Sequence, residues 1–330
     1  MRKANKRRIL TLIISTLLMF GLLVGCTSNA QDDGIKTIGI VQLASHPALD
    51  ATVEGLEAFL EEQGLTNQVK LVLKNAQGDP GVALTIANQF VSDEVDLIYA
   101  IATNAAQAAF NATEVSQIPV VFNAVTDPVD AGIVKSLTSS GNHVTGVSDA
   151  APLLKQLELI KEILPNATKI GLLYNLGEPN GKIQVEQVAA LAPSLGLEAI
   201  VLGVSSSNEI SAAASQLASQ VDAMYNITDN MIAEATALIV DKANEQNIPV
   251  FGAEDGPLDQ GLLAVDGLSY FKLGVQAGSL IQEILFNGVA PSALPITTAQ
   301  DTELKVQLDI AQDLNITIPE SVLERLSTDN

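Results

Sequence analysis

Two stretches of ten residues, VDLIYAIATN (Val95–Asn104) and VDAMYNITDN (Val221–Asn230), decide the fold. Both begin with Val-Asp, share a central Tyr and Ile, and end on Asn. Each is largely apolar without the alternation of a half-buried strand, which is typical of a strand covered on both faces of a parallel sheet. An ordered repeat of this kind predicts two lobes of the same fold.

The segments around these stretches repeat in the same order. KTIGIVQ (Lys36–Gln42) corresponds to TKIGLLY (Thr168–Tyr174), and IPVVF (Ile118–Phe122) corresponds to IPVF (Ile248–Phe251). Segments of helical length lie between the strands, so the sequence predicts an α/β fold of two doubly wound parallel-sheet lobes joined by a hinge. Ligands of such sheets bind beyond the carboxyl ends of the strands, which places the expected site in the cleft between the lobes.

Composition narrows the class of function. The 330 residues are 47% apolar and carry 17 Lys and Arg against 38 Asp and Glu, so a nucleic-acid partner is not expected. One Cys and two His leave no intrachain disulfide and no thiolate cluster for zinc or iron–sulfur. The P-loop, the dinucleotide-binding glycine motif, HExxH and CxxC are all missing. We therefore expect a binding protein, not an enzyme, with no cofactor and no metal.

The first 26 residues differ from the rest of the chain. Residues 1–8 (MRKANKRR) are basic, and residues 9–24 are almost wholly apolar but too short for a ~30 Å hydrocarbon core. This pattern predicts an export signal over residues 1–25, although an uncleaved membrane anchor is the alternative. Leu-Val-Gly-Cys26 resembles a bacterial lipoprotein box, which implies acylation of Cys26 and a tether over residues 26–35. The protein is then anchored by lipid to the outer face of the bacterial cytoplasmic membrane.

Polar side chains follow the strands of both lobes. In the first lobe the candidates for ligand binding are Gln42, His46, Thr103, Asn104, Thr126, Asp127 and Ser148. In the second lobe they are Tyr174, Asn175, Asn180, Asp229, Asn230 and Asp255. Hydroxyls and helix N-termini in the first lobe suit a carboxylate, whereas Asp229, Glu254 and Asp255 suit an ammonium group. The two walls together predict a zwitterion, such as an α-amino acid. Helix capping is the alternative role for Thr103, Ser148, Asn180 and Asp229.

Several blocks resemble ABC-transporter substrate-binding lipoproteins of the tryptophan/tyrosine type. They include HPALD (His46–Asp50), NAQGD (Asn75–Asp79) and TDN (Thr228–Asn230). The resemblance implies a type I periplasmic-binding (Venus-flytrap) fold with three crossovers between lobes. Lobe one would comprise residues 36–145 and 253–292, and lobe two residues 146–252 and 293–330. Asn104 and Gly181 stand where that family often has Pro and Ser.

The resemblance also implies a ligand and partners. The ligand would be an aromatic amino acid, tryptophan first, which a monomeric protein delivers to an ABC permease and its ATPase. A sugar or nucleoside binder is the alternative within the same class, although a chain with 4% aromatic residues has few rings to stack on a sugar. A sensor for a membrane receptor, and an extracellular enzyme that uses His46 with Asp50, are alternatives from other classes.

Overall fold

The computed structural model describes residues 34–298 and 302–326. The described residues from Lys36 onward form one compact unit, which carries both expected lobes. The expected signal segment 1–25, Cys26 and all but the last two residues of the expected tether 26–35 lie outside the described residues. Within the described ranges, no helix combines the length and hydropathy needed to span a membrane.

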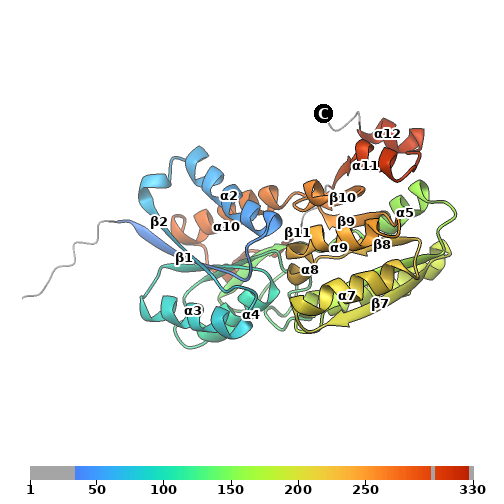
Figure 1. Cartoon of the computed structure of the whole chain (residues 1–330). Coiled ribbons are helices and arrows are strands. Elements are labelled where there is room, and N and C mark those ends of the chain that lie inside the picture. Colours follow the sequence, from blue (N-terminus) through green and yellow to red (C-terminus); the bar gives the residue numbers. More distant parts are fainter. Residues whose placement is uncertain (1–33, 299–301, 327–330) are drawn as a thin grey trace, which may run out of the picture. The chain divides into compact units, whose positions relative to one another are not determined.

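The first sheet has six strands in the order β11-β5-β4-β3-β1-β2. Its members are β1 (Lys36–Gln42), β2 (Val69–Asn75), β3 (Leu97–Ile101), β4 (Val120–Asn123), β5 (Val144–Ser148) and β11 (Thr297–Thr298). All of its strand pairs are parallel. Helices α3 (Pro80–Ser92) and α4 (Thr103–Ala112) pack together on one face, and α2 (Pro47–Glu62) and α10 (Tyr270–Leu285) on the other (Figure 1).

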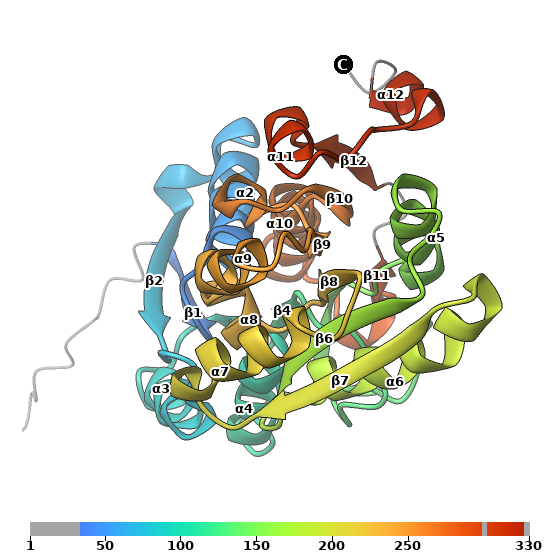
Figure 2. The ribbon, with the colours of Figure 1, turned by 45° about the vertical axis from the view of Figure 1, so that its right-hand side comes forward.

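The second sheet repeats this arrangement in the order β12-β10-β9-β8-β6-β7. Its members are β6 (Lys169–Asn175), β7 (Glu198–Val204), β8 (Ala223–Asn226), β9 (Val250–Glu254), β10 (Ala264–Leu268) and β12 (Glu303–Val306). Only β12, at the edge, pairs antiparallel with its neighbour. The flanking helices are α5 (Leu153–Ile163), α6 (Pro179–Leu191), α7 (Ser207–Ala218), α8 (Asn230–Glu234) and α9 (Thr236–Asn244). Two short helices, α11 (Leu308–Asp313) and α12 (Glu320–Leu326), follow β12 (Figure 2).

The repeated stretches fold as the pattern predicts. β3 and β8 are buried along their whole length, and each is followed directly by a helix that begins near the repeated Asn. Apolar side chains of the first lobe form one core, and those of the second lobe form two cores, one on each face of its sheet. The sheets are therefore covered on both sides, which confirms the doubly wound α/β class.

The chain passes from one sheet to the other at positions that differ from the expected lobe boundaries. β5 in the first sheet extends to Ser148, whereas the first lobe was expected to end at residue 145. Residues 253–268, expected in lobe one, include the end of β9 and all of β10 in the second sheet. The chain returns only at α10, which packs on α2, and then at β11 beside β5. A short strand that contains Gly267 lacks a clear apolar pattern, so its sheet is hard to assign from sequence.

Candidate functional site

The carboxyl ends of the two sheets approach each other through a few direct contacts. His46 Nε2 lies 3.1 Å from Asn230 Oδ1, and Asn104 Nδ2 donates to the carbonyl oxygen of Gly177 at 3.2 Å. Each contact joins the first lobe to the second. A small pocket of about 10 Å³ lies between these walls. Its lining residues are Thr103, Asp127, Asp130, Ala131, Pro179, Asn180 and Ile183. The two lobes therefore meet at the carboxyl ends of their sheets, and residues of both lobes line this pocket.

The first wall is built on the start of α4. No side chain caps this ten-residue helix, and Ala102 before it has a φ of 80°, a value that non-glycine residues rarely adopt. The Oγ1 of Thr103, in a side chain 2% exposed, has no hydrogen-bond partner. A free helix N-terminus next to an unused hydroxyl donor suits an anionic group.

Two other candidates of the first lobe, Gln42 and His46, lie near the start of α2. The Nε2 of Gln42 donates to Asp50 Oδ1 at 2.6 Å and to the carbonyl of Ala44 at 2.7 Å. His46 is the N-terminal capping position of α2 without a capping hydrogen bond, and burial lowers the pKa of its imidazole. The carboxylate of Asp50 accepts from Gln42 and Ser45 and makes no hydrogen bond to the imidazole of His46, so the dyad that the enzyme alternative needs is not formed in this structure.

The remaining three candidates of the first lobe lie near the first crossing. Thr126 Oγ1 donates to Asp149 Oδ1 at 3.0 Å, and Ser148 Oγ donates to the carbonyl of Thr126 at 3.1 Å. Asp127 Oδ1 accepts from the backbone N–H groups of Val129 and Asp130. Thr126 and Ser148 thus shape the hinge region, whereas Asp127 also lines the space between the walls.

The second wall is organised by Glu178, which was not among the expected site residues. Its side chain is 4% exposed and sits at the capping position of α6, just before Pro179. Oε2 accepts from Asn180 Nδ2 at 3.2 Å and from both the backbone N–H and Nδ2 of Asn230, at 3.1 and 2.5 Å. Oε1 accepts from Asn175 Nδ2 and from the backbone N–H of Met231, each at 3.2 Å. Glu178 therefore fixes three of the expected asparagines at once.

Asp229 lies beside Glu178 and caps α8. Its Oδ1 accepts from the backbone N–H of Ile232 at 3.2 Å, and Oδ2 accepts from that of Asn175 at 2.7 Å. The side chain is 1% exposed, and burial together with the charge of Glu178 raises the pKa of its carboxyl well above the usual value. Asp229 therefore caps a helix, which the sequence analysis gave as its alternative role. It also lies next to residues of the cleft.

Two further candidates of the second lobe lie apart from this network. Asp255 forms an ion pair with Lys305 of β12 at 2.7 Å, so its charge is already balanced. Tyr174 is partly buried against the second lobe's core. Three other aromatic residues near strand ends, Phe122, Tyr225 and Tyr270, are 0–2% exposed and belong to the cores of the lobes.

A second group of carboxyls, also missed among the expected site residues, lies where the chain crosses between sheets. Tyr270, the first residue of α10, donates its hydroxyl to Asp149 Oδ2 at 2.8 Å. Burial raises the pKa of Asp149, and burial with the charge of Asp149 raises the pKa of Glu254 to about 8. Three chain segments distant in sequence supply these residues, and no short motif marks them. The only sequence signal was Glu254 at a strand end.

Buried polar atoms without partners gather at the two walls. In the described part of the chain there are five such atoms, and three of them belong to His46, Thr103 and Asn180. Asn180 Nδ2 donates to Glu178 Oε2 and to the carbonyl of Thr228, so the unused Oδ1 is an acceptor. Asn230 Nδ2 donates to Glu178, so its Oδ1 accepts from His46 Nε2–H and leaves His46 Nδ1 as an acceptor. The first lobe thus offers an unused donor at Thr103 and an unused acceptor at His46, and the second lobe offers an unused acceptor at Asn180.

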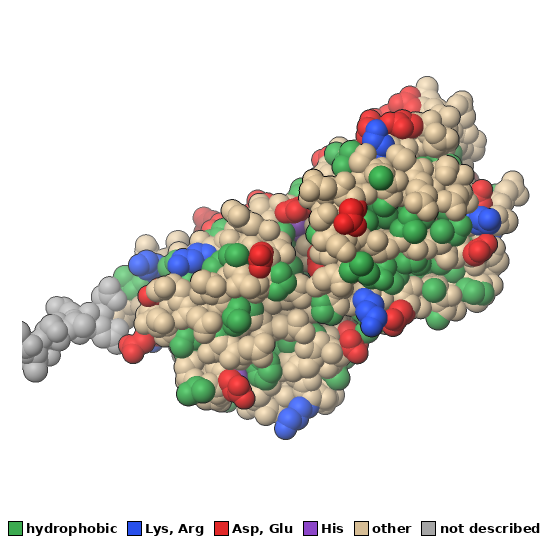
Figure 3. Space-filling view, turned by 60° about the horizontal axis from the view of Figure 1, so that its bottom comes forward, with side chains coloured by type: hydrophobic (Ala, Val, Ile, Leu, Met, Phe, Trp, Pro, Cys, Tyr) green, Lys and Arg blue, Asp and Glu red, His purple; other side chains and the backbone are tan. Residues whose placement is uncertain are grey.

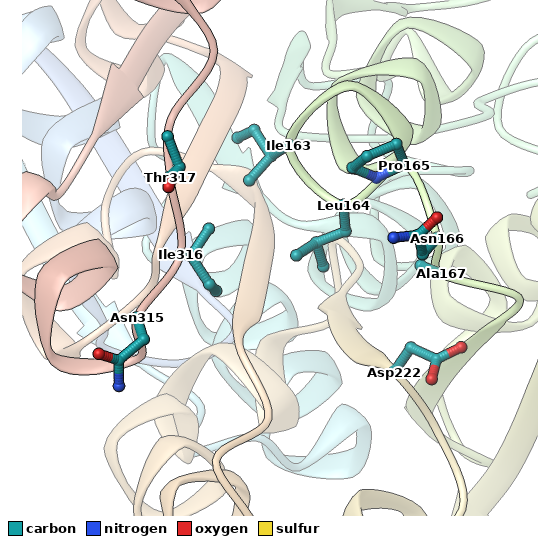
Figure 4. Close-up of a pocket in the computed structure, with 9 residues that line it drawn as sticks. All are labelled: Ile163, Leu164, Pro165, Asn166, Ala167, Asp222, Asn315, Ile316 and Thr317. Atoms are coloured by element: carbon teal, nitrogen blue, oxygen red, sulfur yellow. The ribbon is translucent and has the colours of Figure 1, made fainter.

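The described residues include no group of three or more His, Cys, Asp or Glu side chains that could hold a metal ion. Acidic and basic side chains are scattered over the face in Figure 3. A separate groove of about 450 Å³ lies at the opposite edge of the second sheet, near the start of β6 and β8. Figure 4 shows Leu164 and Ile316 on its two sides, with Asp222 at its rim. None of the expected site residues lines this groove.

Residues 37–328 match the family model described as ABC transporter substrate binding protein. The chain belongs to this family. Its members are extracytoplasmic substrate-binding proteins of ABC transporters, so this protein is the substrate-binding component of such a transporter. A "Tyrosine-binding protein" of Clostridioides difficile (strain R20291) is 40% identical over 339 residues, which cover 99% of this chain and 95% of that protein. The resemblance to the tryptophan/tyrosine type is therefore confirmed.

Two solved structures differ in how well they superpose. A Streptococcus pneumonia ABC domain in complex with L-Trp is 37% identical, with a TM-score of 0.85 over 88% of this chain and 98% of that one. A ligand-free, open substrate binding protein from Clostridium difficile is 41% identical, but its TM-score is 0.67 over 87% and 97%. The protein in complex with L-Trp therefore superposes better than the open, ligand-free one, although it is slightly less identical. Solute-binding proteins only 19% and 13% identical share the type I periplasmic-binding fold.

Proposed function

We propose that this protein binds an aromatic amino acid, tryptophan or tyrosine, as a zwitterion in the cleft and delivers it to an ABC permease and its ATPase. The observation that carries the proposal is the opposite polarity of the two walls. The free N-terminus of α4 and the unpartnered Thr103 hydroxyl offer donors for a carboxylate. The unpartnered Asn180 Oδ1, backed by Glu178 and Asp229, offers an acceptor to an ammonium group.

The comparisons support the ligand class. One relative is named for tyrosine and one neighbour contains L-Trp, and both are more than 35% identical to this chain. The cleft residues explain why a free amine or a free carboxylate alone would be a poor ligand, because each would leave one buried wall without its partner. The permease then recognises the closed, loaded protein, while acylated Cys26 and the tether 26–35 keep the monomer at the outer face of the membrane.

Native mass spectrometry of the freshly purified protein tests the ligand. We expect a mass increment equal to one tryptophan or tyrosine, lost on denaturation and restored by adding the free amino acid. An increment that matches a hexose or a nucleoside, with no response to aromatic amino acids, would overturn the proposal in favour of the sugar or nucleoside alternative. A ligand that is chemically changed on incubation would instead point to an enzyme.

The anchor is tested separately. Replacing the only thiol, in Cys26→Ala, should leave an unprocessed precursor or release the protein into the medium, because no other residue can accept the lipid. A processed variant that still fractionates with membranes, as the parent does, would remove the lipoprotein part of the proposal without touching the ligand.

A further inference from the structure

Glu178 and Asp229 come from loops 51 positions apart, yet their carboxylates converge on the same short piece of backbone. Glu178 accepts the N–H groups of Asn230 and Met231, and Asp229 accepts that of Ile232. Both also hold Asn175, Glu178 through its side-chain amide and Asp229 through its backbone N–H. Two buried carboxylates therefore share one small polar environment.

This carboxylate pair has no cation beside it. In the part of the chain that the structure describes, no Lys or Arg lies within ion-pair distance of either group. The other titratable groups that face the pair are Glu234 of α8, Glu254 at the end of β9, and His46 across the cleft. Backbone dipoles stabilise one negative charge well, but two adjacent charges in a buried site repel each other. The raised pKa of Asp229 fits this arrangement.

Polar atoms without hydrogen-bond partners lie beside the carboxylate pair, and they indicate which kind of ligand could balance its negative charge. Asn180 is 5% exposed and bonds to Glu178, and its free Oδ1 is an acceptor. His46 is 4% exposed, and its Nδ1 is an unused acceptor in the neutral ring. Buried acceptors next to an uncompensated carboxylate pair call for a cation that carries several N–H donors, which describes the ammonium group of an amino acid.

We propose that the carboxyl of Asp229, beside the Glu178 carboxylate, carries a proton in the ligand-free protein and releases it to solvent when the ammonium group of the ligand binds beside them. The proposal rests on the proposed function, since it assumes an amino-acid ligand. The balance is simple: one carboxyl O–H bond breaks, the proton passes to water or buffer, and the ammonium keeps its own protons and replaces the lost positive charge. Affinity for the amino acid then increases with pH, by about tenfold per unit while Asp229 is protonated.

Calorimetric titration with L-tryptophan measures how many protons are released per ligand bound. The titration is repeated in buffers of equal pH and different ionisation enthalpy. At pH 6.5 we expect the observed heat to depend on the buffer, with about one proton released per ligand. In Asp229→Asn the release should fall close to zero. Asp79→Asn is the matched control, because Asp79 is also an aspartate that caps a helix but is exposed and outside the cleft. It should release as many protons as the parent.

Binding heats that are independent of buffer in the parent would overturn the proposal while leaving the proposed function intact, since the amino acid still binds. Unchanged release in a folded Asp229→Asn would overturn it too. Should that variant fail to fold or bind, the infrared difference spectrum of the parent with and without ligand decides, because the carbonyl band of one protonated carboxyl must be lost on adding ligand, even though protonated Glu254 keeps its own band. A difference spectrum without such a loss contradicts the proposal, and loss of an imidazole proton alone would assign the release to His46. Absence of any binding of tryptophan or tyrosine would instead count against the proposed function.

Discussion

The two strands that repeat, β3 and β8, end in the same way in sequence but build different walls. After β3, Ala102 adopts a strained φ of 80°, no side chain caps α4, and Thr103 keeps an unpartnered hydroxyl. After β8, Asp229 caps α8, and Glu178 accepts the next two N–H groups of the same turn. One lobe leaves its helix end available to a ligand, whereas the other fills it with its own carboxylates. A duplicated fold can therefore present opposite polarity on its two walls.

The largest effect should come from removing the charge that organises the second wall. Glu178→Gln places an amide among five N–H donors, which leaves several of them unsatisfied. We expect the free energy of unfolding to fall by about 2–4 kcal/mol and the affinity for tryptophan to fall about 100-fold. Urea unfolding and calorimetry measure the two. Glu186→Gln, exposed on the same helix, is the control. Parental values for both properties in the Glu178 variant would show that the second wall does not depend on its carboxylate.

The raised pKa of Glu254 in the second lobe should make the stability of the protein depend on pH. The pKa of Glu254 rises from 4.5 to about 8 on folding, so the folded protein holds a proton that the unfolded chain releases. Between these values the unfolded chain binds fewer protons, and the free energy of unfolding therefore falls as pH increases. We expect a loss on the order of 2 kcal/mol between pH 6 and pH 8. Glu254→Gln should flatten this slope, whereas exposed Glu57→Gln should keep it. A parental slope in Glu254→Gln would place the proton elsewhere.

The smallest effect is expected from removing single hydroxyl groups. It distinguishes a hydroxyl that faces the ligand, in Thr103, from one that stabilises the fold, in Thr113. Thr103 Oγ1 has no partner, so Thr103→Val should leave the free energy of unfolding unchanged and weaken amino-acid binding by about 1 kcal/mol, or roughly fivefold. Thr113 lies at the other end of the same helix and donates to the carbonyl of Ala109 at 2.7 Å. Thr113→Val should therefore do the reverse, costing about 1–2 kcal/mol of stability and no affinity. If Thr103→Val loses stability and not affinity, the first wall is not the ligand's carboxylate site.

The fold could be predicted from sequence because it depends on local and repeated signals. Buried strands without alternation, helices that follow them, and glycines such as Gly64 and Gly196, whose φ values are 68° and 69°, are visible in the chain itself. The same pattern placed Thr103, Asn180 and Asp229 at strand ends. The position of each lobe boundary was less accurate, because β10 and β11 are short and carry no repeat.

The chemistry of the site could be predicted only in part. The carboxylate in Thr228-Asp229-Asn230 was visible as a difference between the lobes, but its hydrogen bonds to Asn175 and Ile232 were not. Glu178 stood in a stretch already of interest, yet its role depends on the approach of α8, about 50 residues further along the chain. Asp149, Glu254 and Tyr270 meet at the crossings only because two sheets exchange strands there, and no linear pattern records such a meeting.

The most direct test of the central claim is a calorimetric comparison of three ligands: L-tryptophan, tryptamine, which lacks the carboxylate, and indole-3-propionate, which lacks the ammonium group. If one wall binds each charge, tryptophan should bind with one-to-one stoichiometry. Each truncated ligand should bind at least about 100-fold more weakly, because it leaves one buried wall unpaired. Binding of either truncated ligand within about threefold of tryptophan would contradict the claim that the walls of opposite polarity together recognise a zwitterion.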